Sequence, residues 1–212
     1  MRNGQPVEVV PLAASEYPRA GRMLGGAFQT DPLWTVVIGD SVRRPEMLVR
    51  MFTALIKTTA VAQGVVERTP GLEGVALWFP PGKDMGVWAM ARAGFAMPRF
   101  IMRLPRSDRE RMMSVLRQVG ERREALMSEP HWYVAAIGVD SESQGMGFGS
   151  VLMSHGIARA NRDEAPIYLE TETERNIAFY QKLGFDVIEE FTPRGVGVQM
   201  WFMARPATSP RP

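Results

Sequence analysis

The sequence predicts a domain of the α/β or α+β class, and three observations lead to this prediction. After His131, short apolar runs alternate with segments of helical periodicity, which is the pattern of a sheet covered by helices. A glycine-rich turn at residues 144–150 lies between an apolar run and the start of a helical segment. The composition, 45% hydrophobic and 23% charged over 212 residues, is ordinary for a globular protein with a sizeable core.

Composition also argues against several classes of protein. Cysteine is absent, so a disulfide framework, a thiolate metal site and a cysteine nucleophile are excluded. The net charge is only +2 and basic residues alternate with acidic ones, which argues against a nucleic-acid partner. No stretch approaches ~20 uninterrupted apolar residues, and the start of the chain lacks a basic segment followed by an apolar one. We therefore expect a cytoplasmic protein with no membrane partner and no metal. The sequence does not distinguish a monomer from a homodimer.

The first elements are a strand and a helix. Residues 7–12 form a short apolar run and predict a strand. Ser15 is expected to cap a helix that runs to about Gln29, in which apolar residues gather near one face. A proline disfavours helical backbone at the residue before it, so the Asp31-Pro32 pair is expected to end this helix.

A second helix and a pair of strands follow. Pro45 marks the start of the helix, because apolar residues then recur at helical spacing until Gly64. Residues 65–66 and 74–79 are compatible with two strands joined through a Thr-Pro-Gly turn. The Pro-Pro-Gly sequence at residues 80–82 closes the second strand.

Over residues 83–130 the pattern changes from strands and helices to helical segments alone. Helical segments there are broken by Gly94, Pro98 and Pro105, and a longer helix follows. The stretch 85–104 is rich in Met, Trp and Phe, which allows two interpretations. These side chains are ordinary core packed on the sheet, or they form the wall of a substrate pocket, since Met and aromatic residues make adaptable apolar surfaces. We favour core for most of them and a pocket for a few.

The last third returns to alternating strands and helices. The predicted elements are strands at 132–139, 166–171, 186–190 and 197–204, with helices at about 150–162 and 174–183. Gly184 falls where a glycine that ends a helix belongs. We expect one domain over residues 1–205, with a helical insertion at about 83–130, and a disordered tail over 206–212.

The glycine-rich turn is the first candidate site. Glycines at 145, 147 and 149 allow positive φ and leave no side chain to hold a ligand away from the backbone. The helix start that follows adds unpaired N–H groups and about half a positive charge, so the turn suits a phosphate or pyrophosphate. From the glycines alone, a plain connection without a ligand is an equal alternative, because short glycine motifs often match by chance.

A dinucleotide site is a further interpretation of this turn. Gly145, Gly147 and Ser150 approach the G-x-G-x-x-[G/A] pattern, and Glu170 follows about 20 residues later. That fold needs several more strand–helix units, whereas only about sixty residues remain and they end in two consecutive strands. A Walker A phosphate loop is excluded because no Gly-Lys-Ser/Thr follows. The context therefore disfavours an NAD-dependent oxidoreductase.

Two motifs together resemble a known family. Gln144-x-x-Gly147-x-Gly149 is similar to the Q/R-x-x-G-x-G/A loop of the GCN5-related N-acetyltransferases (GNAT family). Residues 176–185, with Asn176 and Tyr180 ahead of a Gly-Phe pair, look like the later N-x-x-x-Y-x-x-x-G-F segment of the same family. The resemblance extends over essentially the whole chain. Short segments at 77–81, 131–133 and 169–171 look like the branch that includes puromycin N-acetyltransferase.

The resemblance implies a GNAT fold, a mixed and mostly antiparallel sheet whose fourth and fifth strands splay apart to admit acetyl-CoA. It implies that the pantetheine arm bonds to the backbone of the fourth strand and to Asn176, although helix capping is an equal alternative for this asparagine. It also implies that backbone amides of the turn hold the pyrophosphate. Met146 departs from the family, in which many members carry a basic residue there. The implied cofactor residues are Ile137, Gly138, Val139, Gln144, Gly145, Met146, Gly147, Phe148, Gly149, Ser150, Asn176 and Tyr180.

The chemistry of amine acetylation assigns further roles. An aliphatic amine has a pKa near 10, so a base or a water chain must remove its proton at neutral pH. The oxyanion needs a backbone N–H, for which the Val139 region is the candidate. The leaving thiolate needs an acid, and Tyr180 is that acid by resemblance, with an aromatic core residue as its alternative. Glu170 is the best side chain for the base, ahead of Glu172 and Glu142.

Other interpretations of the base stay open. His155 is expected to face the sheet from its helix, and His131 opens a strand. Many relatives of the resembled family use ordered water, so a dedicated base is not required.

The sequence therefore predicts an acetyl-CoA-dependent N-acetyltransferase. The acceptor is the primary amine of a small molecule, which attacks directly in a ternary complex. The insertion at 83–130 is expected to shape the acceptor pocket, and Phe28, Trp34, Trp88 and Glu170 are its candidate residues. The alternative is a member of the same fold that binds acyl-CoA as a sensor or interaction module without turnover.

Overall fold

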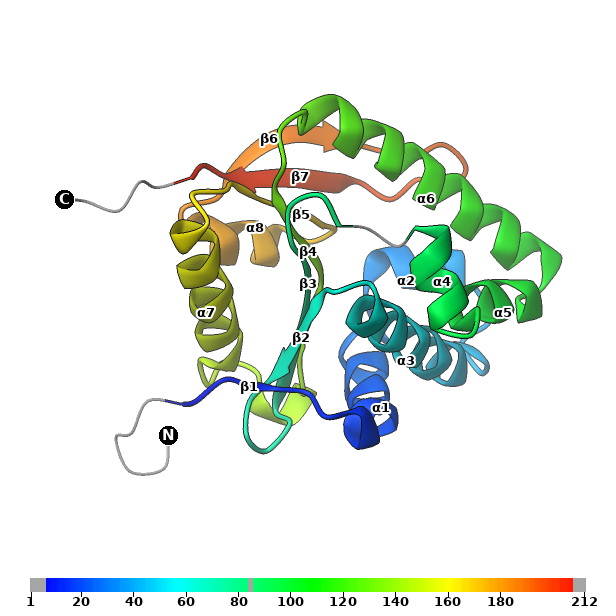
Figure 1. Ribbon diagram of the computed structural model, residues 1–212. Coiled ribbons are helices and arrows are strands. Elements are labelled where there is room, and N and C mark those ends of the chain that lie inside the picture. The colour runs from blue at the N-terminus through cyan, green and yellow to red at the C-terminus, as the bar shows by residue number, and fades with distance from the viewer. Residues whose placement is uncertain (1–6, 84–85, 208–212) are drawn as a thin grey trace.

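The computed structural model describes residues 7–83 and 86–207 and contains one seven-stranded sheet with helices on both faces (Figure 1). The strand order is β1-β2-β3-β4-β5-β7-β6. The strands are β1 (Val10–Pro11), β2 (Val65–Arg68), β3 (Gly74–Phe79), β4 (Trp132–Val139), β5 (Ile167–Thr171), β6 (Asp186–Phe191) and β7 (Met200–Arg205).

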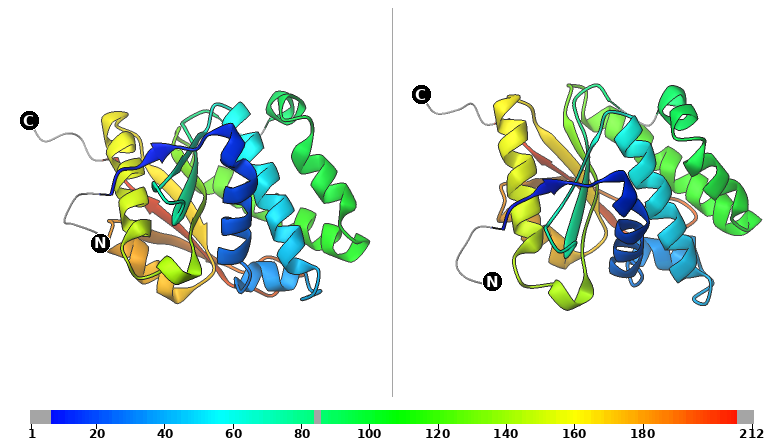
Figure 2. Two further views of the ribbon diagram at one scale, coloured as in Figure 1. Left: turned by 90° about the horizontal axis from the view of Figure 1, so that it is seen from below. Right: turned by 60° about the horizontal axis from the view of Figure 1, so that its bottom comes forward.

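The helices divide between the two faces of the sheet. The described helices are α1 (Tyr17–Ala27), α2 (Pro32–Val37), α3 (Arg44–Val61), α4 (Val87–Arg92), α5 (Ala96–Arg103), α6 (Arg106–Leu126), α7 (Phe148–Arg162) and α8 (Glu174–Gln181). Figure 2 shows α1 and α3 on one side of the sheet and α7 on the other. One apolar core unites α1, α2, α3, α5 and α6 with the sheet, and a second unites α7 and α8 with the opposite face.

The pairing of β4 with β5 determines the shape of the centre of the molecule. It is parallel, whereas every other pair in the described sheet is antiparallel. The ladder holds only two pairs, Trp132 with Ile167 and Tyr133 with Tyr168, so the strands separate beyond these residues. This is the splayed arrangement that the resemblance implied, and the predicted fold class, a mixed and mostly antiparallel GNAT sheet, is confirmed.

Close packing fixes α7 against the sheet. The ring of Trp78 on β3 is fully buried and lies against Gly156 of α7. A Cβ atom at Gly156 would lie 2.1 Å from Cζ2 of Trp78, so a larger residue would push α7 outward. Since the glycine-rich turn ends in α7, this contact also fixes the turn relative to β4.

Several predicted boundaries are corrected by the structure. The first strand is only Val10–Pro11, and Ser15 lies inside a short 3₁₀ turn, so it does not cap α1. Pro98 lies in the first turn of α5, where proline is tolerated, and does not break that helix. The last strand begins at Met200, three residues later than predicted, after a turn in which Gly195 and Gly197 adopt positive φ.

The Asp31-Pro32 pair begins a helix that the sequence did not predict. Asp31 is the N-cap of α2, and its carboxylate accepts hydrogen bonds from the backbone N–H groups of Leu33 at 3.0 Å and Trp34 at 3.2 Å. Pro32 occupies the first helical position, where its fixed φ suits a helix and no donor is lost. The pair ends one helical segment and starts the next.

Two predictions about extent and location stay open. The single-domain assignment stays a prediction, and the tail predicted to be disordered lies mostly at 208–212, outside the described residues. Over the described part of the chain, each helix is too short or too polar to span a bilayer. Cytoplasmic location stays a prediction.

Candidate active site

The turn between β4 and α7 borders a wide groove of about 520 Å³, called here the loop groove. It is lined by the turn, by the end of β4, by the segment between α1 and α2, and by the first turns of α8. All of the residues predicted to contact the cofactor line it except Met146, which is 51% exposed. The lining residues among them are Ile137, Gly138, Val139, Gln144, Gly145, Gly147, Phe148, Gly149, Ser150, Asn176 and Tyr180.

The backbone of the turn explains its glycines. Gly145 and Gly147 have φ of +79° and +89°, and no atom lies within 4 Å of a Cβ built on either residue. They are therefore required for conformation, and the space in front of them is open to a ligand. Gln144 Nε2 donates a hydrogen bond to the carbonyl of Val139 at 3.3 Å, which ties the turn to the end of β4.

The start of α7 adds donors to this open space. The helix begins at Phe148, two residues earlier than predicted, so its free N–H groups lie within the turn. A helix N-terminus preceded by open glycines matches the requirements of a pyrophosphate. The groove therefore fits the anionic part of coenzyme A.

Asn176 is held in the groove and is not a helix cap. Thr173 is the N-cap of α8, and its hydroxyl accepts a hydrogen bond from the backbone N–H of Asn176 at 3.3 Å. The side-chain Nδ2 of Asn176 donates to the hydroxyl of Thr171 at 3.0 Å, at the end of β5. The capping alternative for Asn176 is therefore wrong, and its amide lies at the splayed end of the two strands.

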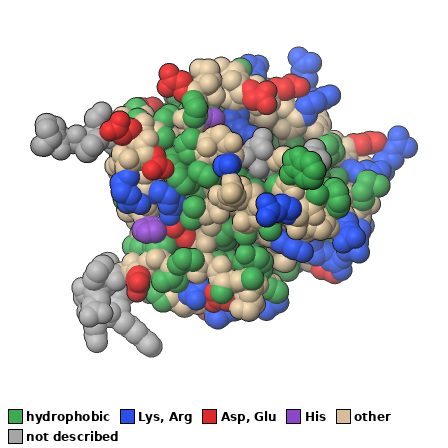
Figure 3. All heavy atoms as spheres, viewed as in Figure 1, with side chains coloured by type: hydrophobic (Ala, Val, Ile, Leu, Met, Phe, Trp, Pro, Cys, Tyr) green, Lys and Arg blue, Asp and Glu red, His purple; other side chains and the backbone are tan. Residues whose placement is uncertain are grey.

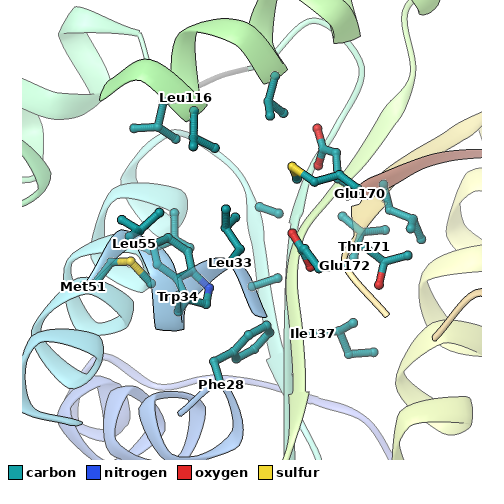
Figure 4. A pocket seen from close by; sticks show the side chains of 18 of the residues that line it. Phe28, Leu33, Trp34, Met51, Leu55, Leu116, Ile137, Glu170, Thr171 and Glu172 are labelled. Atoms are coloured by element: carbon teal, nitrogen blue, oxygen red, sulfur yellow. The ribbon is translucent and has the colours of Figure 1, made fainter. Parts of the chain in front are cut away.

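A second cavity of about 230 Å³, called here the inner cavity, borders β4 and β5 where these two strands separate. Its walls come from α2, α3, α6, β4 and β5, and most of them are apolar (Figure 4). The residues that line both the inner cavity and the loop groove are Phe28, Ile137, Asn176 and Tyr180. The two spaces therefore meet at these side chains.

Acidic side chains stand along the β5 wall of the inner cavity. Glu170 lies on β5 and Glu172 lies in the bend just after the strand, and both line the inner cavity. In Figure 4, Glu172 lies nearer to Phe28 and Ile137 than Glu170 does. Oε1 of Glu170 is buried, and the hydroxyls of Tyr133 and Tyr168 interact with this carboxyl. Asp31, at the edge of the loop groove, adds a third carboxyl close enough to interact with Glu172.

Burial shifts the pKa of each of these carboxyls upward. It raises the pKa of Glu170 to about 7, although the positive charge of Arg123 opposes the shift. It raises the pKa of Glu172 well above the ordinary value, and the charges of Asp31 and Glu170 add to this shift. The pKa of Asp31 is raised to about 6, also by burial, against hydrogen bonds from Trp34 and Leu33. Glu170 and Asp31, with pKa values of about 7 and about 6, are therefore able to exchange protons near neutral pH.

Tyr180 is buried where the two spaces meet. Its ring packs between Phe179 and Phe185, with centroid distances of 5.1 and 5.7 Å. Burial, and to a smaller extent the charge of Glu172, raises the pKa of its hydroxyl above the ordinary value of 10. The hydroxyl therefore stays protonated at neutral pH and is able to act as a proton donor.

Some candidates from the sequence do not lie in the site. Phe28, Trp34 and Glu170 line the inner cavity, but Trp88 does not, because α4 presents it to solvent with 83% of its surface exposed. The expectation that Trp88 contacts the acceptor is corrected. Figure 3, viewed as in Figure 1, shows exposed apolar side chains among Lys and Arg at the right of the molecule, where α4 and α5 lie.

The alternative bases also lie elsewhere. His155 contacts Glu67 on β2, with Nδ1 at 2.9 Å from Oε2, and His131 Nδ1 lies 2.9 Å from the carbonyl of Glu129. Glu142 is exposed on a 3₁₀ turn. None of the three lines the inner cavity or the loop groove.

Sequence reasoning missed three groups in the site. Asp31 was interpreted only as a helix terminator, although an Asp before Pro is also a helix-start signal. Tyr133 lines the inner cavity with Arg123 stacked on its ring at 4.3 Å. The buried hydroxyl of the neighbouring Tyr168 interacts with Glu170, which opposes the rise in the pKa of that carboxyl. Tyr168 stands two residues before Glu170 on β5, where strand alternation could have marked it, whereas Tyr133 approaches Glu170 only because β4 pairs with β5.

Comparison with known proteins agrees with this geometry. Residues 110–185 match the model of the acetyltransferase (GNAT) family. An uncharacterised N-acetyltransferase of Schizosaccharomyces pombe is 25% identical over 181 residues, which cover 82% of this chain and 72% of the relative.

Two solved structures of acetyltransferases share the fold of this chain. A Corynebacterium glutamicum structure described as histone acetyltransferase HPA2 and related acetyltransferase is 25% identical, with a TM-score of 0.68, and the match covers 98% of this chain and all of that one. The Drosophila melanogaster polyamine N-acetyltransferase shares the fold at 14% identity, with a TM-score of 0.59 and coverage of 93% and 98%.

The described sheet and helices form the GNAT fold, and residues 110–185 match the GNAT family. The family match and the relatives support a GNAT-family acetyltransferase. The likeness to the puromycin N-acetyltransferase branch stays a prediction.

Proposed function

We propose that this protein is an acetyl-CoA-dependent N-acetyltransferase that acetylates the primary amine of a small molecule. One observation carries the proposal, namely that the loop groove and the inner cavity meet at Phe28, Ile137, Asn176 and Tyr180. A thioester that enters from one side and an amine that enters from the other would face each other there. The amine would attack directly in a ternary complex.

The loop groove would hold coenzyme A along its length. The amides of the turn and of the first turn of α7 would bind the pyrophosphate, and the unpaired edge of β4 with Asn176 would bind the pantetheine arm. When bound, acetyl-CoA supplies an acetyl thioester, whose C–S bond breaks as the C–N bond to the amine forms. The groups that orient the amine and transfer protons are side chains of the protein, close to where the loop groove meets the inner cavity.

Proton transfer is assigned to the carboxyls and to Tyr180. An amine arrives mostly as ammonium, which Glu170 and Glu172 would attract and from which an ionised carboxylate would take a proton. Glu170, with a pKa of about 7, is partly ionised at neutral pH and suits this role. The Tyr180 hydroxyl would donate a proton to the sulfur of the leaving thiolate. The ammonium loses two protons in all, one to the carboxylate before attack and one as the C–N bond to the acetyl group forms. The sulfur of coenzyme A gains one proton, and the other is released to solvent.

A module that binds acyl-CoA without turnover is the other candidate from the sequence. Such a module needs the loop groove alone. A second cavity with titratable carboxyls at the end of that groove favours the enzyme.

The test combines acetyl-CoA binding with turnover. Calorimetry would measure acetyl-CoA affinity, and a panel of primary amines would be screened for release of the coenzyme A thiol and for the acetylated product by mass spectrometry. We expect tight binding of acetyl-CoA and stoichiometric formation of thiol and amide with at least one amine. Binding without turnover across the panel would favour the sensor alternative, and preferential binding of NAD would contradict the proposal.

A further inference from the structure

The inner cavity has one acidic wall and otherwise apolar walls. Among the described residues that line it, the charged ones are Glu170 and Glu172, both on the β5 side. The opposite side is built from α2, α3 and α6, where the lining side chains are aliphatic, aromatic or Met. Figure 4 shows Leu33, Trp34 and Leu55 facing the two carboxyls across the space.

The size of this apolar part sets an upper limit for what it holds. An apolar cavity of about 150 Å³ accommodates one benzene ring. The inner cavity, at about 230 Å³, has room for a ring and a short chain or for an alkyl chain of similar volume. Met97 and Met112 among its lining residues allow the walls to adapt to different apolar shapes.

Charge discriminates between classes of amine in such a cavity. One ammonium would be paired by Glu170 and Glu172, which compensate for the water that it loses. A second ammonium, carried to the apolar end, would be buried without a partner, and that is strongly unfavourable. Polyhydroxylated amines would lose hydrogen bonds to water in the same way.

We infer that the acceptor is a primary amine with a single positive charge and an apolar body. The ammonium would face the carboxyls of Glu170 and Glu172, and the body would lie between α2, α3 and α6. This inference rests on the proposed function, because it names the substrate class of the same site. It separates the protein from acetyltransferases of polyamines.

Matched ligands test the inference by equilibrium binding. Hexylamine and octylamine would be titrated into the protein saturated with coenzyme A, next to 1,6-diaminohexane and 1,8-diaminooctane, which differ by a second terminal amine. Butylamine would be titrated in the same way, and we expect affinity to rise about fourfold per added methylene from butylamine through hexylamine to octylamine. Each diamine is expected to bind at least about tenfold more weakly than the monoamine of equal length. A flat monoamine series, or diamines that bind as well as monoamines, would overturn the inference.

A pair of variants on α6 tests the location of the body. Leu116 lines the inner cavity and is 47% exposed, whereas Met113 is 49% exposed on the same helix but does not line it. Leu116→Glu is expected to weaken hexylamine and octylamine at least about tenfold and to narrow the difference from the diamines. Met113→Glu should leave all four affinities within about twofold. Equal effects of the two substitutions would place the body outside this cavity and overturn the inference.

Acetyl-CoA binding keeps the two proposals separate. If acetyl-CoA binds and diamines are acetylated in preference to monoamines, the inference fails and the proposed function stands. If acetyl-CoA does not bind, the proposed function fails. The amine titrations into the free protein then still decide whether the inner cavity prefers apolar monocations, and a lack of preference overturns the inference.

Discussion

The loop groove and the inner cavity lie next to each other but are built in different ways. The part of the groove proposed to hold the pyrophosphate is the backbone of one continuous turn and of the start of α7, and the contact of Gln144 with Val139 ties this turn to β4. The inner cavity is formed by side chains from α2, α3, α6, β4 and β5. A backbone site is insensitive to most substitutions and suits a constant ligand. A side-chain site changes with each substitution and suits a variable one.

The largest expected effect is on the groove, from Gly147→Val. The new side chain would project into the open space before the turn, and valine strongly disfavours a φ of +89°. We expect acetyl-CoA affinity to fall at least about 100-fold, as measured by calorimetry, while hexylamine affinity changes little.

Gly195 provides a matched control for that variant. It has a φ of +90°, has no atom within 4 Å of a built Cβ, and does not line either space. Gly195→Val should therefore lower the melting temperature to a similar extent without loss of acetyl-CoA affinity. If both variants lost affinity equally, strain and not occupancy of the groove would be the cause.

The next effect falls on the junction of the two spaces. Tyr180→Phe keeps the ring between Phe179 and Phe185 but removes the proton donor. We expect kcat to fall about 100-fold, with acetyl-CoA affinity nearly unchanged, because water partly substitutes for the hydroxyl. Tyr17→Phe, on α1 and outside both spaces, is the control for loss of a tyrosine hydroxyl. A destabilised Tyr180→Phe variant with full kcat would assign the residue to the core alone.

These two regions also differ in how far the sequence predicts them. The groove was predictable because Gln144, Gly147 and Gly149 are close in sequence, and because Asn176 and Tyr180 are four residues apart on one helix and face the same side. The splayed strands followed from the family resemblance.

The inner cavity could not be predicted in the same way. Asp31 and Glu172 interact although 141 positions separate their numbers, and helical periodicity does not reveal which face of α4 or α6 meets the sheet. Trp88 was placed in the pocket for that reason, whereas Met112 and Leu116 line it. Residues assembled from distant segments leave no local pattern.

The acidic wall is tested by pH, with an expected effect of about tenfold. The ionised form of Glu170 would accept the proton, and its pKa of about 7 means that this form decreases about tenfold per pH unit below 7. The ratio of kcat/KM between the wild type and Glu170→Gln, measured with one amine, cancels the titration of the amine itself. We expect this ratio to fall with decreasing pH from about 8 to 6.

Glu142→Gln, exposed on its 3₁₀ turn, should give a constant ratio. A constant ratio for Glu170→Gln would move the base to Glu172 or to water.

The smallest expected effect concerns Met146, the position at which the turn departs from the resembled family. Its side chain is 51% exposed and does not line the loop groove, so an arginine there would add a positive charge beside the proposed pyrophosphate site without altering the backbone. An exposed charge contributes little, about 0.5–1 kcal/mol, so we expect Met146→Arg to increase acetyl-CoA affinity about two- to fivefold at low salt. Screening at high ionic strength should abolish most of the gain.

Met102→Arg, 69% exposed on α5, adds the same charge at a distance and should have no effect. A gain that persists in high salt, or one shared by Met102→Arg, would mean that the turn does not hold the phosphates, since only a local charge interaction is both position-specific and screened.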